Sequence, residues 1–215
     1  MVKRFCLILS LILNGFNKIM PQVLNIPTMD TMNDDEFFAF CEANRPNGMN
    51  FERDKYGHII FMSPTGSIGG YNDGEIFVEI KLWNRKKNNG IVFPSSTGFT
   101  LPDSSIRSPD VAWIRRERWE QVPHELRKKF APICPDFVVE VISESDTYNE
   151  HENKMREWIA NGCRLGWLID SNEQAYMIFT PQNTNPDKQP FGIINGGDVL
   201  EGLAIDLRTV FEDIG

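Results

Sequence analysis

Two short stretches decide how this chain folds: "SPDVAWI" at residues 108–114 and "CPDFVVEVIS" at residues 134–143. Each has the apolar, β-branched character of a strand, and each carries acidic residues. An ionised carboxylate is costly among apolar groups unless a cation or hydrogen-bond donors compensate its charge. The acids of these two strands are therefore the first candidates for a functional site.

Glu140 is the charged residue inside "FVVEVI". Alternation places it on one face with Val138 and Ile142, and the other face is apolar as well, so we expect a central strand. The alternative role for Glu140 is a partly buried acid held by an arginine or by backbone donors. Asp136 is a poor partner for it in a metal site, because four residues of extended strand span about 13 Å.

Asp110, at the start of "DVAWI", is the candidate partner from a neighbouring strand. Its alternative role is a turn residue that follows Pro109, which is common for aspartate. Lys154 is the third candidate, because a short connection would carry its flank of the helix expected over residues 148–162 back over the end of the Glu140 strand. The alternative for Lys154 is an exposed pair with Glu150 at i,i+4 spacing.

A further acid, Glu75, stands at the start of the helix expected over "EIFVEIKLWNRKK" at residues 75–87. It is either a first-turn residue that complements the helix dipole or a further metal ligand, and Glu79 competes with it for the second role. The preceding "GSIGG" at residues 66–70 lacks the GK[ST] of a phosphate-binding loop, so we expect a flexible turn there.

The remaining pattern predicts strands flanked by a few helices, which is an α/β sandwich around a mixed sheet. Thr31 or Asn33 is expected to cap a short helix that has Glu36 near its start. The other expected elements are a hairpin over 50–64 with its turn at 55–57, a strand and turn back over 91–102, a helical or irregular segment over 115–130, strands over 164–170 and 174–180, and a final hairpin or edge pair over 197–207.

Composition limits the possible partners. The chain has 215 residues, 41% of them hydrophobic, which is enough for one domain with a sizeable core. A formal charge of -8 argues against a general polyanion binder, so contact with nucleic acid would have to be local. Basic stretches with interleaved aromatics at residues 81–87, 115–119 and 126–129 are either flanks of a phosphate track or ordinary solvated faces.

The four cysteines lie far apart and form no CxxC pair, which predicts neither a zinc site nor a disulfide framework and favours a reducing cytoplasm. Residues 1–19 have a basic start and a short apolar run, but no small-x-small cleavage site follows them. The run is also too short for a comfortable membrane span. We expect residues 1–19 to be a non-native extension or a signal-like segment, translation to begin at Met20, and the domain to span residues 20–215.

Taken together, "SPDVAW", "PDFVVEVIS", the helical Lys154 and "NG" followed by "GWLID" resemble the Uma-two family of endonucleases, within the PD-(D/E)XK restriction-endonuclease-like superfamily. The resemblance runs from about Met20 to the C-terminus and includes "MSPTG", "STGF" and "GDVL". It implies a restriction-endonuclease-like mixed β-sheet flanked by helices. Asp110 and Glu140 would bind Mg²⁺ or Mn²⁺, and Glu75 would match an acid on the first core helix.

One position departs from the superfamily pattern, which places a lysine two residues after the second acid. That position is Ile142 here, and Lys154 on the following helix would supply the amine instead. The implied activity is metal-dependent hydrolysis of DNA phosphodiester bonds by a cytoplasmic enzyme without a membrane segment. The resemblance also allows a homodimer. The alternatives are a catalytically inactive nuclease-like binding or assembly module and a hydrolase of smaller phosphate esters.

Overall fold

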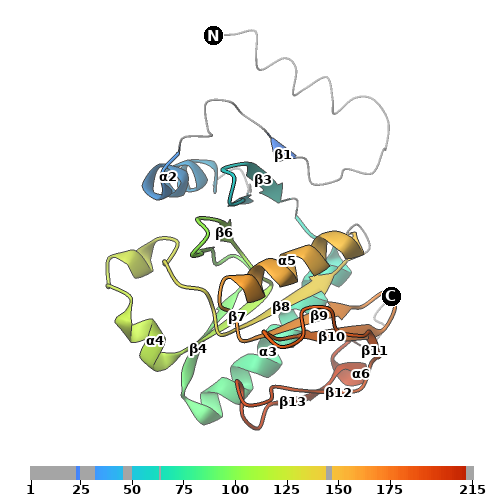
Figure 1. Ribbon diagram of the computed structural model, residues 1–215. Helices are drawn as coiled ribbons and strands as arrows, with labels where there is room; N and C mark the ends of the chain where they lie inside the picture. Colours follow the sequence, from blue (N-terminus) through green and yellow to red (C-terminus); the bar gives the residue numbers. More distant parts are fainter. Residues whose placement is uncertain (1–22, 25–31, 46–49, 63, 144–146, 212–215) are drawn as a thin grey trace, which may run out of the picture.

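The computed structural model describes residues 23–24, 32–45, 50–62, 64–143 and 147–211 (Figure 1). For Val23 and Leu24 it describes the backbone alone. Its main element is a six-stranded sheet in the order β11-β10-β9-β8-β7-β4. β8 and β9 are parallel and all other neighbours are antiparallel, so the expected mixed sheet is confirmed. Its strands are β4 (Gly90–Pro94), β7 (Val111–Arg115), β8 (Phe137–Ile142), β9 (Leu165–Asp170), β10 (Ala175–Phe179) and β11 (Gln189–Pro190).

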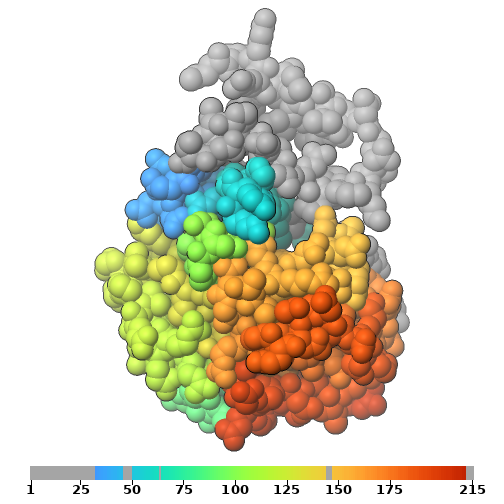
Figure 2. All heavy atoms as spheres, viewed as in Figure 1, coloured from blue at the N-terminus to red at the C-terminus, as the bar shows by residue number. Residues whose placement is uncertain are grey.

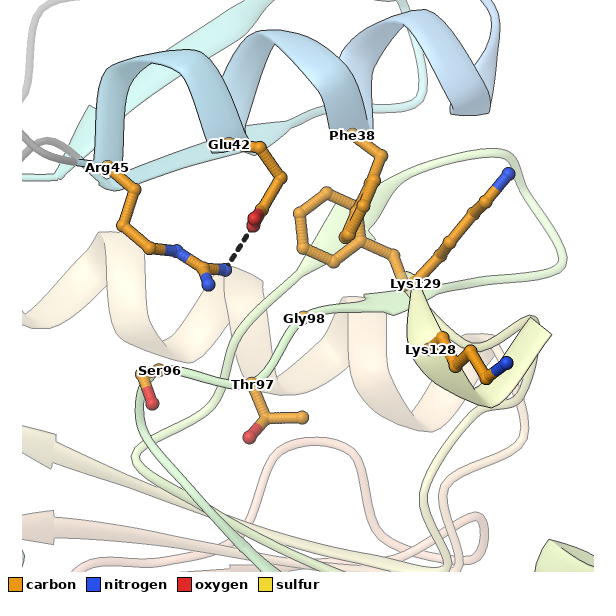
Figure 3. A pocket seen from close by; sticks show the side chains of 9 residues that line it. Phe38, Glu42, Arg45, Ser96, Thr97, Gly98, Lys128 and Lys129 are labelled. Carbon is orange, nitrogen blue, oxygen red and sulfur yellow. Dashed lines mark ion pairs between the residues drawn. The ribbon is translucent and has the colours of Figure 1, made fainter. Parts of the chain in front are cut away.

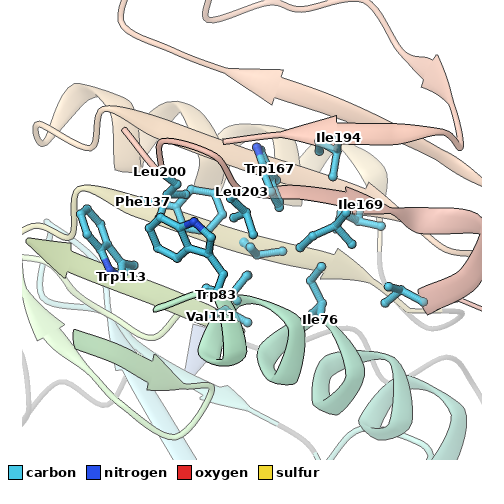
Figure 4. Close-up of a cluster of buried hydrophobic side chains, with 14 of the residues drawn as sticks. Ile76, Trp83, Val111, Trp113, Phe137, Trp167, Ile169, Ile194, Leu200 and Leu203 are labelled. Atoms are coloured by element: carbon cyan, nitrogen blue, oxygen red, sulfur yellow. The ribbon is translucent and has the colours of Figure 1, made fainter. Parts of the chain in front are cut away.

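The two faces of this sheet are covered by different helices, α3 (Ser67–Lys87) on one face and α5 (Tyr148–Ala160) on the other. On the α3 face, Ile76 and Trp83 pack against residues from β7, β8 and β9 (Figure 4). The C-terminal elements complete this cluster: β12 (Ile193–Asn195), β13 (Ala204–Asp206) and α6 (Leu207–Val210). The α5 face is a second cluster that includes Met155 and Trp158.

All six residues of β8 are buried, which confirms it as a central strand. Val139 and Val141 belong to the cluster under α3, whereas Val138 and Ile142 belong to the cluster under α5. Because side chains alternate along a strand, Glu140 points toward the α5 side. The chain therefore places one carboxylate inside the apolar layer between the sheet and α5.

A second, smaller sheet has the order β1-β3-β2-β6-β5 and lies beside α2 (Asp34–Asn44). Figure 2 shows the blue and cyan residues of α2, β2 and β3 packed on the green and yellow residues of the main body. The strands are β1 (Val23–Leu24), β2 (Asn50–Arg53), β3 (Ile59–Met62), β5 (Phe99–Thr100) and β6 (Ile106–Arg107). The hairpin expected over residues 50–64 is thus confirmed, with Gly57 in its turn at φ 89°.

Local signals decide several other boundaries. Asn33 caps α2 through a capping box with Glu36, as one of the two expected caps. The segment 115–130 contains α4 (Arg116–Gln121) and a single 3₁₀ turn, η2 (Leu126–Lys128). Gly162 follows α5 at φ 105°, a backbone conformation that glycine adopts without strain.

One expectation about a boundary is wrong, and another is correct only in part. α3 begins at Ser67, so "GSIGG" enters a helix instead of forming a flexible turn. A glycine inside a helix costs only about 1 kcal/mol, less than a core-facing helix gains from burying its apolar stripe. At the other end, β13 pairs with β12 and not with a strand inside residues 197–207, because the left-handed Gly197 and Gly202 make that segment a loop.

The expectation for residues 1–19 lies outside the described residues. Among the residues that the structure does describe, no helix is long and apolar enough to cross a membrane. Cys41, Cys134 and Cys163 are free thiols.

A pair of glycine substitutions tests the packing of the main sheet. A Cβ at Gly90 would lie 2.1 Å from Nε1 of the rigid, fully buried Trp113 ring, so Gly90→Ala should destabilise the protein by about 2 kcal/mol or more. A Cβ at Gly74 would meet nothing within 4 Å, so Gly74→Ala should stabilise the helix by about 0.5–1 kcal/mol. Urea unfolding measures both changes, and equal effects would contradict the close approach at Gly90.

Candidate active site

Asp110 and Glu140 face each other at one end of the main sheet. Val111 pairs with Val139 in the antiparallel register, so Asp110, one residue earlier, lies opposite Glu140. Opposite residues of such a pair have Cβ atoms about 4.5–5.5 Å apart and point to the same face. The backbone N–H of Val141 donates a 2.7 Å hydrogen bond to Asp110 Oδ2, which fixes this carboxylate against β8.

α5 supplies the donors that compensate Glu140. The side chain of Glu140 is buried, with Oε1 accepting a 2.8 Å hydrogen bond from Trp158 Nε1 and Oε2 accepting a 3.1 Å bond from Lys154 Nζ. These two donors are four residues apart, one helical turn, so they lie on the same side of α5. The structure therefore brings Asp110, Glu140 and Lys154 together and does not pair Lys154 with Glu150.

Glu52 of β2 joins this group, and sequence reasoning missed it. Its Oε1 lies 3.2 Å from Lys154 Nζ and accepts a 2.8 Å hydrogen bond from the backbone N–H of Ser108. The carbonyl of Ser108 in turn accepts a 3.0 Å bond from Lys154 Nζ. The signal was present, since Glu52 is an acid inside a strand just as Glu140 is, but its charged neighbours Arg53 and Asp54 made that strand look exposed.

Arg107 of β6 extends the network. It donates a 3.0 Å bond to Glu52 Oε2 and binds Glu157 of α5 through two bonds of 2.9 and 2.7 Å. A bidentate arginine–carboxylate pair fixes the orientation of both groups. Arg107 thus connects the small sheet to α5 next to Lys154.

The network contains more negative than positive charge. Glu52, Glu140 and Glu157 contact Lys154 or Arg107 directly, and Asp110 also acts on Lys154 electrostatically. Within the described part of the chain, four carboxylates therefore share two cationic side chains. Such an imbalance in a buried site favours the uptake of a proton or of a further cation.

The pKa values reflect this imbalance. Burial raises the pKa of Glu140 to about 7, against the opposing effect of Lys154 and with a further increase from Glu52. Burial would also raise the pKa of Glu52, but Lys154 and Arg107 outweigh it and hold that pKa below its usual value. Burial would lower the pKa of Lys154, but Glu140, Glu52 and Asp110 raise it well above its usual value. Lys154 is therefore an ammonium group at neutral pH.

The other acids considered from the sequence are not part of this group. Glu75 lies on α3, which covers the opposite face of the sheet, and Glu79 is exposed on the same helix. Asp136, at the other end of β8, accepts a 2.9 Å hydrogen bond from the backbone of Arg115 and pairs with Arg118. Asp136 is thus a structural acid, as its distance along the strand indicated.

A core residue stands at the strand position where the superfamily pattern has a lysine. Ile142 is buried in the cluster under α5, on the same face as Glu140. A lysine there would have to place its amine among apolar side chains. Lys154 instead approaches Glu140 from the helix that covers this face.

No group of three His, Cys, Asp or Glu side chains with the geometry to hold a metal ion occurs among the described residues. The donors that are present nevertheless suit a hard divalent cation, because Mg²⁺ commonly binds through one or two carboxylates together with water and substrate phosphates. Asp110 and Glu140 are two such carboxylates, and an ionised carboxylate has about four lone-pair sites. The residues present therefore fit Mg²⁺ or Mn²⁺.

The family model Uma2, described as "Putative restriction endonuclease", matches residues 34–208. The chain belongs to the Uma2 family. A similar solved structure is a putative nuclease belonging to DUF820 from Anabaena variabilis ATCC 29413, with a TM-score of 0.62 and 18% sequence identity over 75% of this chain and 89% of that chain. This likeness confirms the nuclease-like fold. A search of the curated proteins finds no match to the chain.

Of the three basic stretches in this Uma2 chain, two lie away from the acids and the third lines a hollow that reaches Gly98. Residues 81–87 end α3 on the opposite face, and residues 115–119 begin at the far end of β7 from Asp110. Lys128 and Lys129 line an open hollow of about 210 Å³ together with Arg45 and Gly98 (Figure 3). A Cβ at Gly98 would lie 3.4 Å from Ser108 Oγ, so this hollow begins next to the residue that accepts from Lys154.

A tryptophan pair tests the hydrogen bond to Glu140. Trp158 and Trp167 are both fully buried, but Trp167 Nε1 has no hydrogen-bond partner among the described residues. Trp158→Phe removes a donor from a buried carboxylate, whereas Trp167→Phe removes only volume. We expect Trp158→Phe to destabilise the protein by about 1–3 kcal/mol more than Trp167→Phe, measured by urea unfolding at pH 8. Equal losses would show that the Nε1 bond to Glu140 contributes nothing.

Proposed function

We propose that this Uma2 protein is a divalent-metal-dependent endonuclease that hydrolyses DNA phosphodiester bonds. The observation that carries the proposal is the convergence of Asp110 and Glu140 from adjoining strands with Lys154 from α5. Two carboxylates that can bind a metal ion thus lie beside one ammonium group. Metal-assisted hydrolysis of a phosphodiester uses groups of these two kinds. Family membership supports the same reaction class.

Asp110 and Glu140 would hold Mg²⁺ or Mn²⁺, and the bound ion would supply a water of lowered pKa and positive charge for the phosphate under attack. The chain's own residues prepare the two carboxylates for this role. The N–H of Val141 orients Asp110, and Trp158 orients Glu140, so both carboxylates are held in place before a cation binds. Preorganised groups of this kind are what electrostatic catalysis depends on.

Lys154 acts in this proposal as a cation and not as a base. Its three N–H groups face three acceptors, Glu140, Glu52 and the carbonyl of Ser108. An ammonium group in this position stabilises negative charge that develops on a phosphate oxygen, or orients the attacking water. Glu52 is a positioning residue, since it acts by holding Lys154 in place.

The substrate would reach the site from the side of Ser108 and Asp110, which are half-buried, whereas Glu140 and Glu52 are fully buried. The hollow lined by Lys128 and Lys129 begins on this side and offers a place for the neighbouring DNA backbone. Lys128 pairs with Glu125 and Lys129 with Asp35, but all four side chains are well exposed. Exposed pairs contribute about 0–1 kcal/mol, so a phosphate can replace the acid.

We also propose that the functional domain spans residues 20–215 and works in a reducing cytoplasm. Burial raises the pKa of the Cys134 thiol to about 12, and Cys163 is shifted in the same direction by its own burial. Both thiols are therefore inert and act as small apolar side chains. A reducing compartment suits a core that contains such groups.

One observation favours a second function, a nuclease-like binding or assembly module that does not cut. Lys154 already compensates Glu140 and Glu52, so the group is stable without a metal ion. A module of this kind would keep the ion pairs for folding alone. Cleavage and metal binding separate the two functions.

The cleavage experiment offers purified protein plasmid, linear and single-stranded DNA with Mg²⁺ or Mn²⁺. We expect the wild type to cut at least one substrate. In Asp110→Asn and in Lys154→Met the cleavage rate should fall by about 100-fold or more, as is usual when a group that stabilises the transition state electrostatically is removed. Glu150→Gln, an exposed acid on the same helix as Lys154, is the matched control and should cut like the wild type. Equal cutting by Asp110→Asn and wild type would assign the activity to a contaminant.

Metal binding by calorimetry tests the ligands directly. Glu140 must lose its proton to bind a cation, and its pKa is raised to about 7 by burial. Protons therefore compete below pH 7, and affinity for Mn²⁺ should rise as the pH increases from about 6 to about 8, with protons released on binding. Binding should be lost in Asp110→Asn. No binding at millimolar Mn²⁺ at pH 8 would favour the module.

A further inference from the structure

The outward face of α3 exposes an unusual set of apolar side chains. Seven large hydrophobic residues are exposed among the described residues, and four of them lie on this helix: Ile68, Tyr71, Val78 and Leu82, at 51, 38, 45 and 42%. Glu75 lies between Tyr71 and Val78, so the spacing along the face alternates three and four residues. This is the repeat by which two helices pack along a common seam.

α3 already buries one apolar stripe in the core of the domain. Ile76, Ile80 and Trp83 belong to the core cluster beneath the helix, and Figure 4 shows Ile76 and Trp83 pointing into it. The exposed stripe is therefore a second apolar face on one helix. An exposed apolar row of this length in an otherwise charged protein marks an interaction surface.

The charges on α3 indicate what binds there. Acids occupy the middle of the helix, with Glu75 and Glu79, whereas its last turn is basic, with Arg85, Lys86 and Lys87. A second α3 in antiparallel orientation would place each half against the opposite charge, and a parallel one would oppose like charges. Two-fold symmetric dimers join the same surface of both copies, which an antiparallel helix pair satisfies.

We propose that this chain forms a two-fold symmetric homodimer through the exposed face of α3, with the two helices antiparallel. An axis that passes between Val78 and Leu82 brings Val78 against Leu82 of the second copy. The same register places Glu75 toward Arg85 of the second copy. The inference does not depend on the nuclease activity.

The apolar run within residues 1–19 is a weaker candidate for this face. That segment carries Lys3, Arg4 and Lys18 and no acid, so it offers nothing to the basic last turn of α3. The size of the face also matters. A 21-residue helix is about 31 Å long, and one such face is smaller than the roughly 800 Å² per partner of a standard interface. The association is therefore weak and depends on concentration.

Sedimentation velocity of the full chain tests the proposal over a range from about 1 µM to about 500 µM, which covers weak interfaces. We expect the wild type to shift from monomer to dimer within this range and Leu82→Glu to stay monomeric. Leu126→Glu is the matched control, because Leu126 is 39% exposed on η2 and the neighbouring Trp119 and Val122 pack on the α5 face of the sheet, so this variant should dimerise like the wild type. A thermal melt by circular dichroism confirms that each variant is folded.

Charge reversal tests the orientation. Glu75→Arg and Arg85→Glu should each weaken dimerisation at least tenfold, and the double variant should restore it, because both symmetry-related contacts are exchanged together. A wild type that remains monomeric throughout the range overturns the proposal. A double variant that dimerises no better than the single variants overturns the antiparallel arrangement.

Discussion

The ammonium group of Lys154 is the interaction on which the rest of this structure depends. It joins Glu52 of the small sheet, Glu140 of the main sheet and the carbonyl of Ser108 between β6 and β7. Without it, the described residues would leave Glu140 only the neutral donor Trp158, and Glu52 would depend on Arg107. The loss of one partner from a buried ion pair costs about 3–5 kcal/mol. One amine thus holds two sheets and a helix in register at the same place where the chemistry is proposed.

The same charged side chains stabilise the fold and form the proposed site. The ion pairs compensate Glu140 and Glu52, yet among the residues that the structure describes four carboxylates contact or face only Lys154 and Arg107 as cations, so the site favours an additional positive charge. Burial acts in the same direction, since it raises the pKa of Glu140 to about 7 and so favours the binding of a proton near neutral pH. Both features agree with the proposed nuclease, in which the acids are compensated before a metal ion and DNA bind.

The two helices that cover the main sheet serve different purposes. α5 delivers Lys154 and Trp158 to the acids and keeps its apolar stripe in the core. α3 buries one stripe in the core and leaves another exposed, next to charges that are ordered along the helix. The proposed chemistry and the proposed association thus lie on opposite faces of one sheet.

The sequence by itself determined which residues stand out within their own strand or helix, because strand alternation and helix capping are local. It identified Glu140 and Asp110 as acids in apolar strands, excluded Asp136 by distance, and identified Asn33 as one of two possible caps. Only the tertiary structure decided the partners. Glu52 lies 88 residues before Glu140 and meets it through Lys154, and Glu75 is separated from both by the sheet. Periodicity tells which way a side chain points, but long-range packing decides which charges share a buried space.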